Sequence, residues 1–171
     1  YRRQRQMCIR DRGNIDRLEK KWEFNTGQIG RFSGTPLQID DGIYLCTAQN
    51  VVVALDADTG KERWRMDPEN KTPPYGLLGN CRGVTYYQLL GTDSEKICSE
   101  RIFTATTDAR LIAMDKETGQ ACEDFGEKGQ ISLLAGMGEV KPMYYFVTSP
   151  ATVASGALVV GGWVADNQEV N

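Results

Sequence analysis

Few residues of this chain combine a reactive type with a setting that suits chemistry. Arg82 follows a loop and precedes a predicted strand, a place that would aim a rigid guanidinium fork at a carboxylate. Asp166 and Asn167 end a nearly apolar stretch, and their oxygen atoms suit Ca²⁺ or Mg²⁺. Thr148 offers a hydroxyl. Taken alone, these are also a surface arginine on a sheet edge, an ordinary turn and a strand residue, so both interpretations stay open.

The elements that must position these residues form a repeat. The segment 54–60, Ala-Leu-Asp-Ala-Asp-Thr-Gly, returns at 113–119 as Ala-Met-Asp-Lys-Glu-Thr-Gly. In each copy Gly supplies the left-handed position of a turn, and Asp and Thr can bond its backbone. After the first copy a strand is predicted over 61–66, with Trp64 on it. Two β-rich runs joined by a short polar turn precede each copy, at 43–48 with 51–53 and at 102–106 with 111–112.

Partial units flank the two copies. Residues 18–22 resemble the end of such a unit, and 146–164 opens another, with strands over 147–154 and 158–164 around a turn at 155–156. Periods of about 40 to 60 residues with four short strands each are typical of β-propeller blades, which stack because one sheet cannot bury both its faces. We therefore expect an all-β fold of about three blades, too few to close a ring. A β-sandwich with two similar hairpins is the alternative.

Charge is divided unevenly along the chain. Residues 1–12 hold five Arg and one Asp, whereas the remainder holds 15 basic and 22 acidic groups. We set residues 1–12 aside as a non-native or disordered basic segment, with a phosphate-binding arm as the alternative. The propeller domain is expected over 13–171, truncated at its C-terminal end. Its acidic balance disfavours a nucleic-acid surface, and no apolar run approaches the roughly 20 residues that cross a bilayer.

Four cysteines lie outside the basic segment, which holds Cys8. They form no C-x-x-C pair, and the chain has no His, which disfavours a zinc site. Cys81 and Cys98 flank a polar excursion at 91–95, so a bridge between them would close that loop in an oxidising compartment. Two unpaired thiols are the alternative.

Together these features resemble the eight-bladed propeller of the quinoprotein alcohol and sugar dehydrogenases, which use pyrroloquinoline quinone. The blades of that family carry the repeat Ala-x-Asp-x-x-Thr-Gly-x-x-x-Trp. Residues 54–64 match it completely, and the second copy departs from it at Glu123, where Trp is expected. Further stretches look like the membrane-bound branch acting on glucose, quinate or shikimate. They are Gly-Thr-Pro-Leu at 34–37, Leu-Cys-Thr-Ala at 45–48, Cys-Arg-Gly-Val at 81–84, Thr-Ser-Pro at 148–150 and Ala-Asp-Asn at 165–167. The resemblance covers residues 14–171.

The resemblance implies roles for the residues that could do chemistry. It places Arg82 and Thr148 at the carboxylates of the cofactor. It makes Asp166 and Asn167 ligands of a Ca²⁺ or Mg²⁺ ion, and such an ion would polarise the quinone oxygen as a Lewis acid.

Two further positions of the implied cofactor site depart from the family. Gln49 stands where glucose-oxidising members carry a histidine, and it cannot titrate near neutrality. Ser33 stands where many relatives place a glutamate. Both departures put glucose in doubt as the substrate without excluding an alcohol.

The resemblance further implies an oxidoreductase that takes hydride from a sugar, polyol or cyclic alcohol and passes electrons to ubiquinone. It would work on the periplasmic side of the bacterial inner membrane, held by a segment not present in this chain. The catalytic aspartate and a lysine near the quinone belong to later blades of the family, so no catalytic base is assigned here and the fragment alone is expected to be inactive.

Two other functions stay open. One is a non-catalytic propeller scaffold of the outer-membrane assembly type, which would need no inward arginine or metal ligands. The other is a sugar-binding propeller with exposed aromatic residues at its axis, for which the candidates are Tyr86, Tyr87, Tyr144 and Tyr145. Convergence of Arg82, Thr148 and the Asp166-Asn167 pair near one axis would favour the enzyme.

Overall fold

The computed structural model describes residues 18–70, 80–93 and 96–165, and these residues form antiparallel sheets with no helix among them. None of the described segments is therefore a helix able to cross a membrane. Strands follow one another in chain order within the two larger sheets. The first sheet contains β1 (Leu37–Ile39), β2 (Gly42–Cys46), β3 (Val52–Asp56) and β4 (Glu62–Met66). The second contains β5 (Thr85–Gln88), β6 (Glu100–Ala105), β7 (Arg110–Asp115) and β8 (Gln130–Ser132).

The third unit is a hairpin interrupted in the middle. It contains β9 (Tyr145–Phe146), β10 (Thr152–Ala154), β11 (Ala157–Val159) and β12 (Trp163–Val164). β10 pairs with β11 and β9 pairs with β12. Ser155 and Gly156 make the tight turn with φ values of 49° and 77°, as hairpin turns of two residues require. The turn predicted at 155–156 is confirmed.

Both faces of the first sheet are buried, because successive residues of a strand point to opposite sides. One face meets the second sheet in a core whose members from the two sheets are Tyr44, Val52, Ala54, Trp64, Ile102, Ile112 and Met114. The alternate residues, Leu45, Val53 and Leu55, pack against Trp22 and Phe24 of the segment before the sheet. Burying one such large apolar side chain contributes roughly 1.5–3 kcal/mol. Stacking of sheets is thus required by the pattern of the strands.

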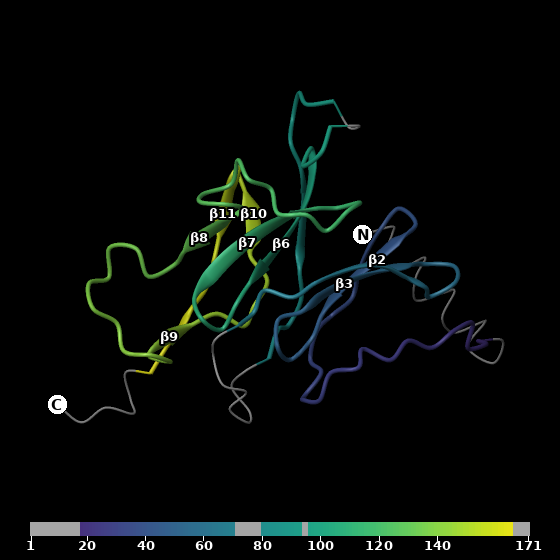
Figure 1. The fold of residues 1–171 in the computed structure, drawn as a ribbon, viewed down its shortest axis with the longest axis horizontal. Helices are drawn as coiled ribbons and strands as arrows, with labels where there is room; N and C mark the ends of the chain where they lie inside the picture. The colour runs from purple at the N-terminus through teal and green to yellow at the C-terminus, as the bar shows by residue number, and fades with distance from the viewer. Residues whose placement is uncertain (1–17, 71–79, 94–95, 166–171) are drawn as a thin grey trace, which may run out of the picture.

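The second sheet repeats this arrangement toward the third unit. Phe103, Leu111 and Ala113 point away from the first sheet and pack against Val147 and Ala151. Figure 1 shows the result as a succession of sheets in chain order, from the blue β2 and β3 through the teal and green β6 and β7 to the yellow β10 and β11. The all-β prediction is confirmed.

Two tryptophans fasten successive units to each other. The indole N–H of Trp22 donates to the carbonyl oxygen of Ala57 over 3.0 Å, and that of Trp64 donates to the carbonyl oxygen of Lys116 over 2.9 Å. Each ring also lies against the glycine of a turn, so closely that a Cβ at Gly119 would be 2.6 Å from the Trp64 ring. The two contacts are equivalent. Trp22 therefore docks on the first sheet as Trp64 docks on the second.

The Asp-x-x-Thr-Gly turns have the hydrogen bonds that the sequence predicts. The Asp56 carboxylate accepts bonds from the backbone N–H and the hydroxyl of Thr59, over 2.9 and 2.7 Å, and Gly60 has φ of +70°. Equivalent bonds close the turn at 115–119. The Arg63 guanidinium, and then the Thr59 bonds, hold the pKa of the Asp56 carboxyl well below its usual range. Each turn is thus a rigid platform for a docking indole.

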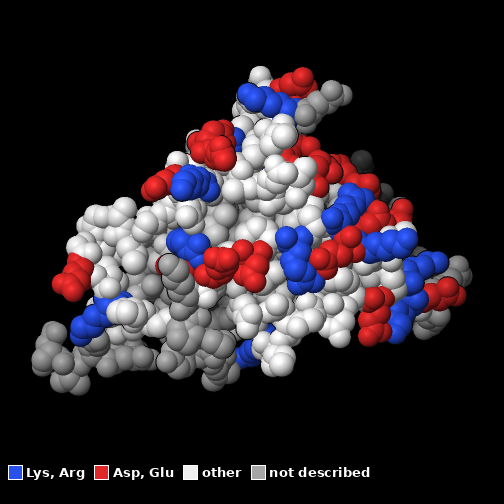
Figure 2. Space-filling model, viewed as in Figure 1, with Lys and Arg blue, Asp and Glu red and all other residues white. Residues whose placement is uncertain are grey.

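Charged side chains fasten the same end of the sheets. Lys116, with 7% of its side chain exposed, contacts Glu100 of its own sheet at 2.9 Å and Asp40 of the first sheet at 3.2 Å. Burial alone lowers the pKa of Lys116, but hydrogen bonds with Glu100, Glu117 and Asp40 outweigh it and raise that pKa. On the face shown in Figure 2, basic and acidic side chains alternate and form no continuous basic field.

Two disulfides join Cys46 to Cys81 and Cys98 to Cys122. The predicted bridge between Cys81 and Cys98 is therefore wrong, and so is the alternative of unpaired thiols. The reason is sheet stacking. Cys81 lies with Cys46 in the core between the first two sheets, whereas Cys98 lies with Cys122 in the core on the opposite face of the second sheet. Cys8 and the basic segment 1–12 lie outside the described residues.

The second sheet departs from the first after its turn at 115–119. β4 begins soon after Gly60, but the chain makes a loop after Gly119 before β8 begins at Gln130. Glu123, at the position that holds the docking tryptophan in the first repeat, is exposed in that loop. The disulfide from Cys122 to Cys98 ties the loop to the turn before β6.

Replacing Gly119 with Ala in the full-length protein tests the docking contact, and Gly156→Ala is its matched control. Both glycines have positive φ, so each alanine costs about 1–2 kcal/mol of backbone strain. Only Gly119 faces an indole, whereas nothing lies within 4 Å of a Cβ at Gly156. We expect G119A to lose about 1–3 kcal/mol more than G156A in denaturant unfolding, the usual cost of overpacking. Equal losses would show that the indole does not need the glycine.

Peptide mapping tests the disulfide pairs. Lys or Arg residues separate all four cysteines, so trypsin places each in its own peptide. Mass spectrometry of the unreduced digest should find the peptide of Cys46 linked to that of Cys81, and the peptide of Cys98 linked to that of Cys122. A linked pair of Cys81 and Cys98 peptides would contradict the stacking of the first two sheets described above.

Candidate functional site

The segments that begin the three units lie side by side. The N–H of Thr35 donates to the carbonyl oxygen of Arg82 over 2.9 Å, and the N–H of Arg82 donates to the carbonyl oxygen of Thr148 over 2.8 Å. Thr35 also forms a parallel bridge with Gly83. Such bonds arise because the stacked sheets approach one another along this edge. Two residues selected from the sequence, Arg82 and Thr148, are thereby brought together.

Arg82 is exposed although its neighbours Cys81, Gly83 and Val84 are buried. It precedes β5, so its main chain is held by the adjoining units rather than by the ladder of its own sheet. Arg82 forms no ion pair with any residue in the described part of the chain. Thr148 is half-buried beside it. An arginine so placed can present its two-pronged donor to a carboxylate ligand.

Ser33 reaches the same edge through Asn80. The side-chain amide N–H of Asn80 donates to Ser33 Oγ over 3.0 Å, and Asn80 is 8% exposed while Ser33 is exposed. Since the serine oxygen accepts this bond, its own O–H is left to donate to a ligand. Asn80 was not selected from the sequence. The signal that could have found it is its position directly before the Cys-Arg-Gly motif.

Gln49 lies exposed in the turn between β2 and β3. No hydrogen bond among the described residues joins it to Arg82 or Thr148. Its neighbour Asn50 is fully buried and donates to the carbonyl oxygen of Ala105 in the second sheet over 3.1 Å. The turn that carries Gln49 is therefore fixed to the second sheet, with the Gln49 side chain directed to solvent.

The metal ligands predicted from the sequence, Asp166 and Asn167, lie outside the described residues. The last described residue, Ala165, donates its N–H to the carbonyl oxygen of Tyr144 over 2.8 Å, four residues before Thr148. Among residues 18–70, 80–93 and 96–165, no group of three or more His, Cys, Asp or Glu gathers as a metal site.

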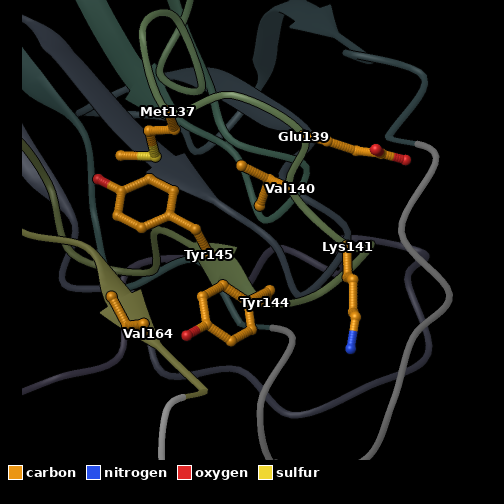
Figure 3. Close-up of a pocket in the computed structure, with 7 residues that line it drawn as sticks. All are labelled: Met137, Glu139, Val140, Lys141, Tyr144, Tyr145 and Val164. Atoms are coloured by element: carbon orange, nitrogen blue, oxygen red, sulfur yellow. The ribbon is translucent and has the colours of Figure 1, made fainter. Parts of the chain in front are cut away.

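A pocket of about 330 Å³ lies between the loop before β9 and the strand β12. Figure 3 shows the rings of Tyr144 and Tyr145 with Met137, Val140 and Val164 around it, while the charged ends of the remaining two lining residues point away from the rings. The lining is thus mostly apolar and aromatic, with Glu139 and Lys141 as its charged members. It contains none of the cofactor residues predicted from the sequence.

The tyrosines expected at the axis of a sugar-binding propeller do not gather there. Tyr86 and Tyr87 pack against different apolar cores, on opposite faces of the second sheet. The Tyr86 hydroxyl donates to Glu100, and burial together with that bond raises the pKa of Tyr86 to about 12. Tyr144 and Tyr145 line the pocket described above.

Comparison with known proteins bears directly on this arrangement. The family model described as "PQQ: Glucose/ethanol/alcohol dehydrogenase, beta-propeller domain" matches residues 8–171. The chain is 38% identical over 166 residues to the quinoprotein glucose dehydrogenase of Escherichia coli (strain K12), an alignment covering 90% of this chain and 21% of that protein. It is 34% identical over 182 residues to the quinate/shikimate dehydrogenase (quinone) of Acinetobacter baylyi, covering 92% and 22% respectively.

A solved structure shares the fold. The quinohemoprotein alcohol dehydrogenase from Comamonas testosteroni superposes with a TM-score of 0.66 at 22% identity, over 90% of this chain and 20% of that one. The predicted propeller fold is thereby confirmed, and the family resemblance is confirmed by the relatives. The chain spans about a fifth of the length of the curated relatives it matches.

Proposed function

The chain belongs to the β-propeller family of dehydrogenases that use pyrroloquinoline quinone, and we propose that it supplies the cofactor-binding inner edge of the first blades of such an enzyme. The observation that carries this proposal is the pair of backbone hydrogen bonds joining Thr35, Arg82 and Thr148. They set a cation and a hydroxyl on adjacent inner segments. The whole enzyme would oxidise a sugar, polyol or cyclic alcohol and pass the electrons to ubiquinone.

The residues at the inner edge suit a flat tricarboxylate. Arg82, which has no ionic partner within the described residues, would bind a carboxylate through its guanidinium, and Thr148 would donate a hydroxyl bond beside it. Ser33 has a donor left after accepting the Asn80 bond, and Gln49 would contribute a neutral amide. The donor set thus fits the cofactor by its chemistry: one cation and several neutral donors for several carboxylate and quinone oxygens.

The chemistry of the bound group is hydride acceptance from the carbinol carbon of the substrate. The residues of this chain would bind and orient that group, and Asp166 with Asn167 would supply oxygen ligands to a Ca²⁺ or Mg²⁺ ion beside it. No residue of this chain is proposed as the base that takes the hydroxyl proton. That role falls to an aspartate in another part of the full-length protein, so this chain alone would be inactive.

Substrate choice would follow from Gln49 and Ser33. Neither side chain is charged, where a histidine and a glutamate would place titrating groups. A site without these groups disfavours a reaction that depends on a titrating histidine, as in the glucose-oxidising members of the family. Among a sugar, a polyol and a cyclic alcohol, a sugar such as glucose is therefore the least favoured substrate.

A scaffold remains the second candidate, but one observation disfavours it. A scaffold needs the docking turns and has no use for an exposed arginine held at the inner edge by two neighbouring units. The relatives named above are dehydrogenases. The sugar-binding alternative loses support from the burial of Tyr86 and Tyr87 against separate cores.

We further propose that the enzyme works on the periplasmic side of the bacterial inner membrane, attached by a segment beyond this chain. The two disulfides support this location, because disulfides persist in oxidising compartments such as the periplasm. The quinone acceptor, ubiquinone, would be reached from the same membrane.

Arg82→Ala in the full-length protein should weaken binding of pyrroloquinoline quinone by about 1.5–3 kcal/mol, the scale of a hydrogen bond to a charged group. Titration of the apoenzyme with the cofactor measures this. Arg65→Ala is the matched control, because Arg65 lies on β4, the strand farthest from this edge, and pairs there with Glu62. Unchanged affinity in R82A would remove Arg82 from the site.

Asp166→Ala should lower the activity of the full-length protein, and excess Ca²⁺ or Mg²⁺ should restore part of it, because one of several oxygen ligands is lost. Measuring activity against metal concentration shows how much activity the added metal restores. Asp58→Ala, at an exposed position in a turn of the first sheet, is the control. Full activity of D166A without added metal would count against the role as a ligand.

A further inference from the structure

The disulfide between Cys46 and Cys81 crosses from one sheet to the next directly beside Arg82. We infer that this cross-link is a positioning device for Arg82: it fixes the main chain from which the guanidinium reaches the cofactor, and so sets cofactor affinity. The inference rests on the proposed function, since it concerns the residue proposed there as the carboxylate clamp. It assigns Cys46 and Cys81 a role beyond stability.

The cross-link is buried where two sheets meet. Cys46 is the last residue of β2 and is fully buried, and Cys81 is 1% exposed in the segment that leads to β5. Gly34 covers the bridge closely, because a Cβ on it would lie 2.9 Å from the carbonyl oxygen of Cys46 and 3.7 Å from its Sγ. The covalent bond therefore joins fixed points on two sheets and leaves little room for one to slide over the other.

The segment 80–83 depends on its neighbours for its position. β5 begins at Thr85, so Arg82 precedes the ladder of its own sheet. It is held instead by the Ser33 bond of Asn80, by the cross-link of Cys81 and by the two backbone bonds of Arg82. Of these restraints only the disulfide is covalent. One of its cysteines, Cys81, is the residue directly before Arg82.

Restraint at Cys81 bears on affinity through preorganisation. An arginine whose main chain can shift must be ordered when the ligand binds, and that ordering subtracts from the binding free energy. Without the cross-link, Arg82 would still carry its guanidinium, but its main chain could move more. The expected effect is roughly 3- to 10-fold weaker cofactor binding, the range that ordering one long side chain implies.

The second disulfide provides a matched control. Cys98 lies in the turn before β6 and Cys122 in the loop before β8, on the face of the second sheet away from Cys46 and Cys81. The cysteines of the two bridges are separated by 35 and 24 residues, and loop-closure entropy changes only with the logarithm of that length. Removing either bridge should therefore lower stability by a similar amount. Only removal of the first should lower cofactor affinity.

The experiment compares C46S/C81S with C98S/C122S in the full-length apoenzyme. Pyrroloquinoline quinone is titrated to give Kd, and denaturant unfolding of the same samples gives stability. We expect both variants to lose stability and only C46S/C81S to bind the cofactor roughly 3- to 10-fold more weakly. Should serine prevent folding at these buried positions, C46A/C81V keeps the space filled with apolar atoms and carries the same expectation.

A second comparison separates positioning from general loosening. In the R82A background, removal of Cys46 and Cys81 should leave Kd unchanged, because the cross-link acts through Arg82. A further loss of affinity in that background, or normal affinity of C46S/C81S with Arg82 present, would overturn the inference. Normal affinity of R82A alone would instead overturn the proposed function.

Discussion

The stacking of this chain depends on the central strands of its two larger sheets, which are buried and apolar on both faces. Alternation along β3 sends Val52 and Ala54 toward the next sheet and Val53 and Leu55 toward the preceding segment. A sheet of this kind cannot be stable with one face in water, so the units must stack. The docked indole of Trp64 and the ion pair between Lys116 and Asp40 then help to set how the first two sheets stack, because each joins one sheet to the other.

The candidate site is a product of that stacking rather than of any one sheet. Arg82 and Thr148 are 66 residues apart in the chain and belong to different units, yet their main chains share a hydrogen bond. The segments that carry these two residues are bonded to neighbouring units, with Arg82 before β5 and Thr148 between β9 and β10.

Local patterns predicted the fold well, and contacts between sheets mark where prediction from sequence failed. The Asp-x-x-Thr-Gly turns and the turn at 155–156 could be read from residues close together in the chain, because turns and strand periods are local. The pairing of Cys81 could not, since its partner is decided by which face of the sheet each cysteine occupies. Asn80 was missed for the same reason: its bond to Ser33 crosses between units.

Each indole reaches forward along the chain, from Trp22 to a turn 35 residues later and from Trp64 to one 52 residues later. During synthesis the turn of a newly made sheet would therefore meet an indole that an earlier part of the chain already carries. Folding would then proceed one sheet at a time, as in a repeat protein whose units contact only their nearest neighbours. Such a chain needs no distant segment until the ring closes, which limits the apolar surface exposed to other molecules while translation continues.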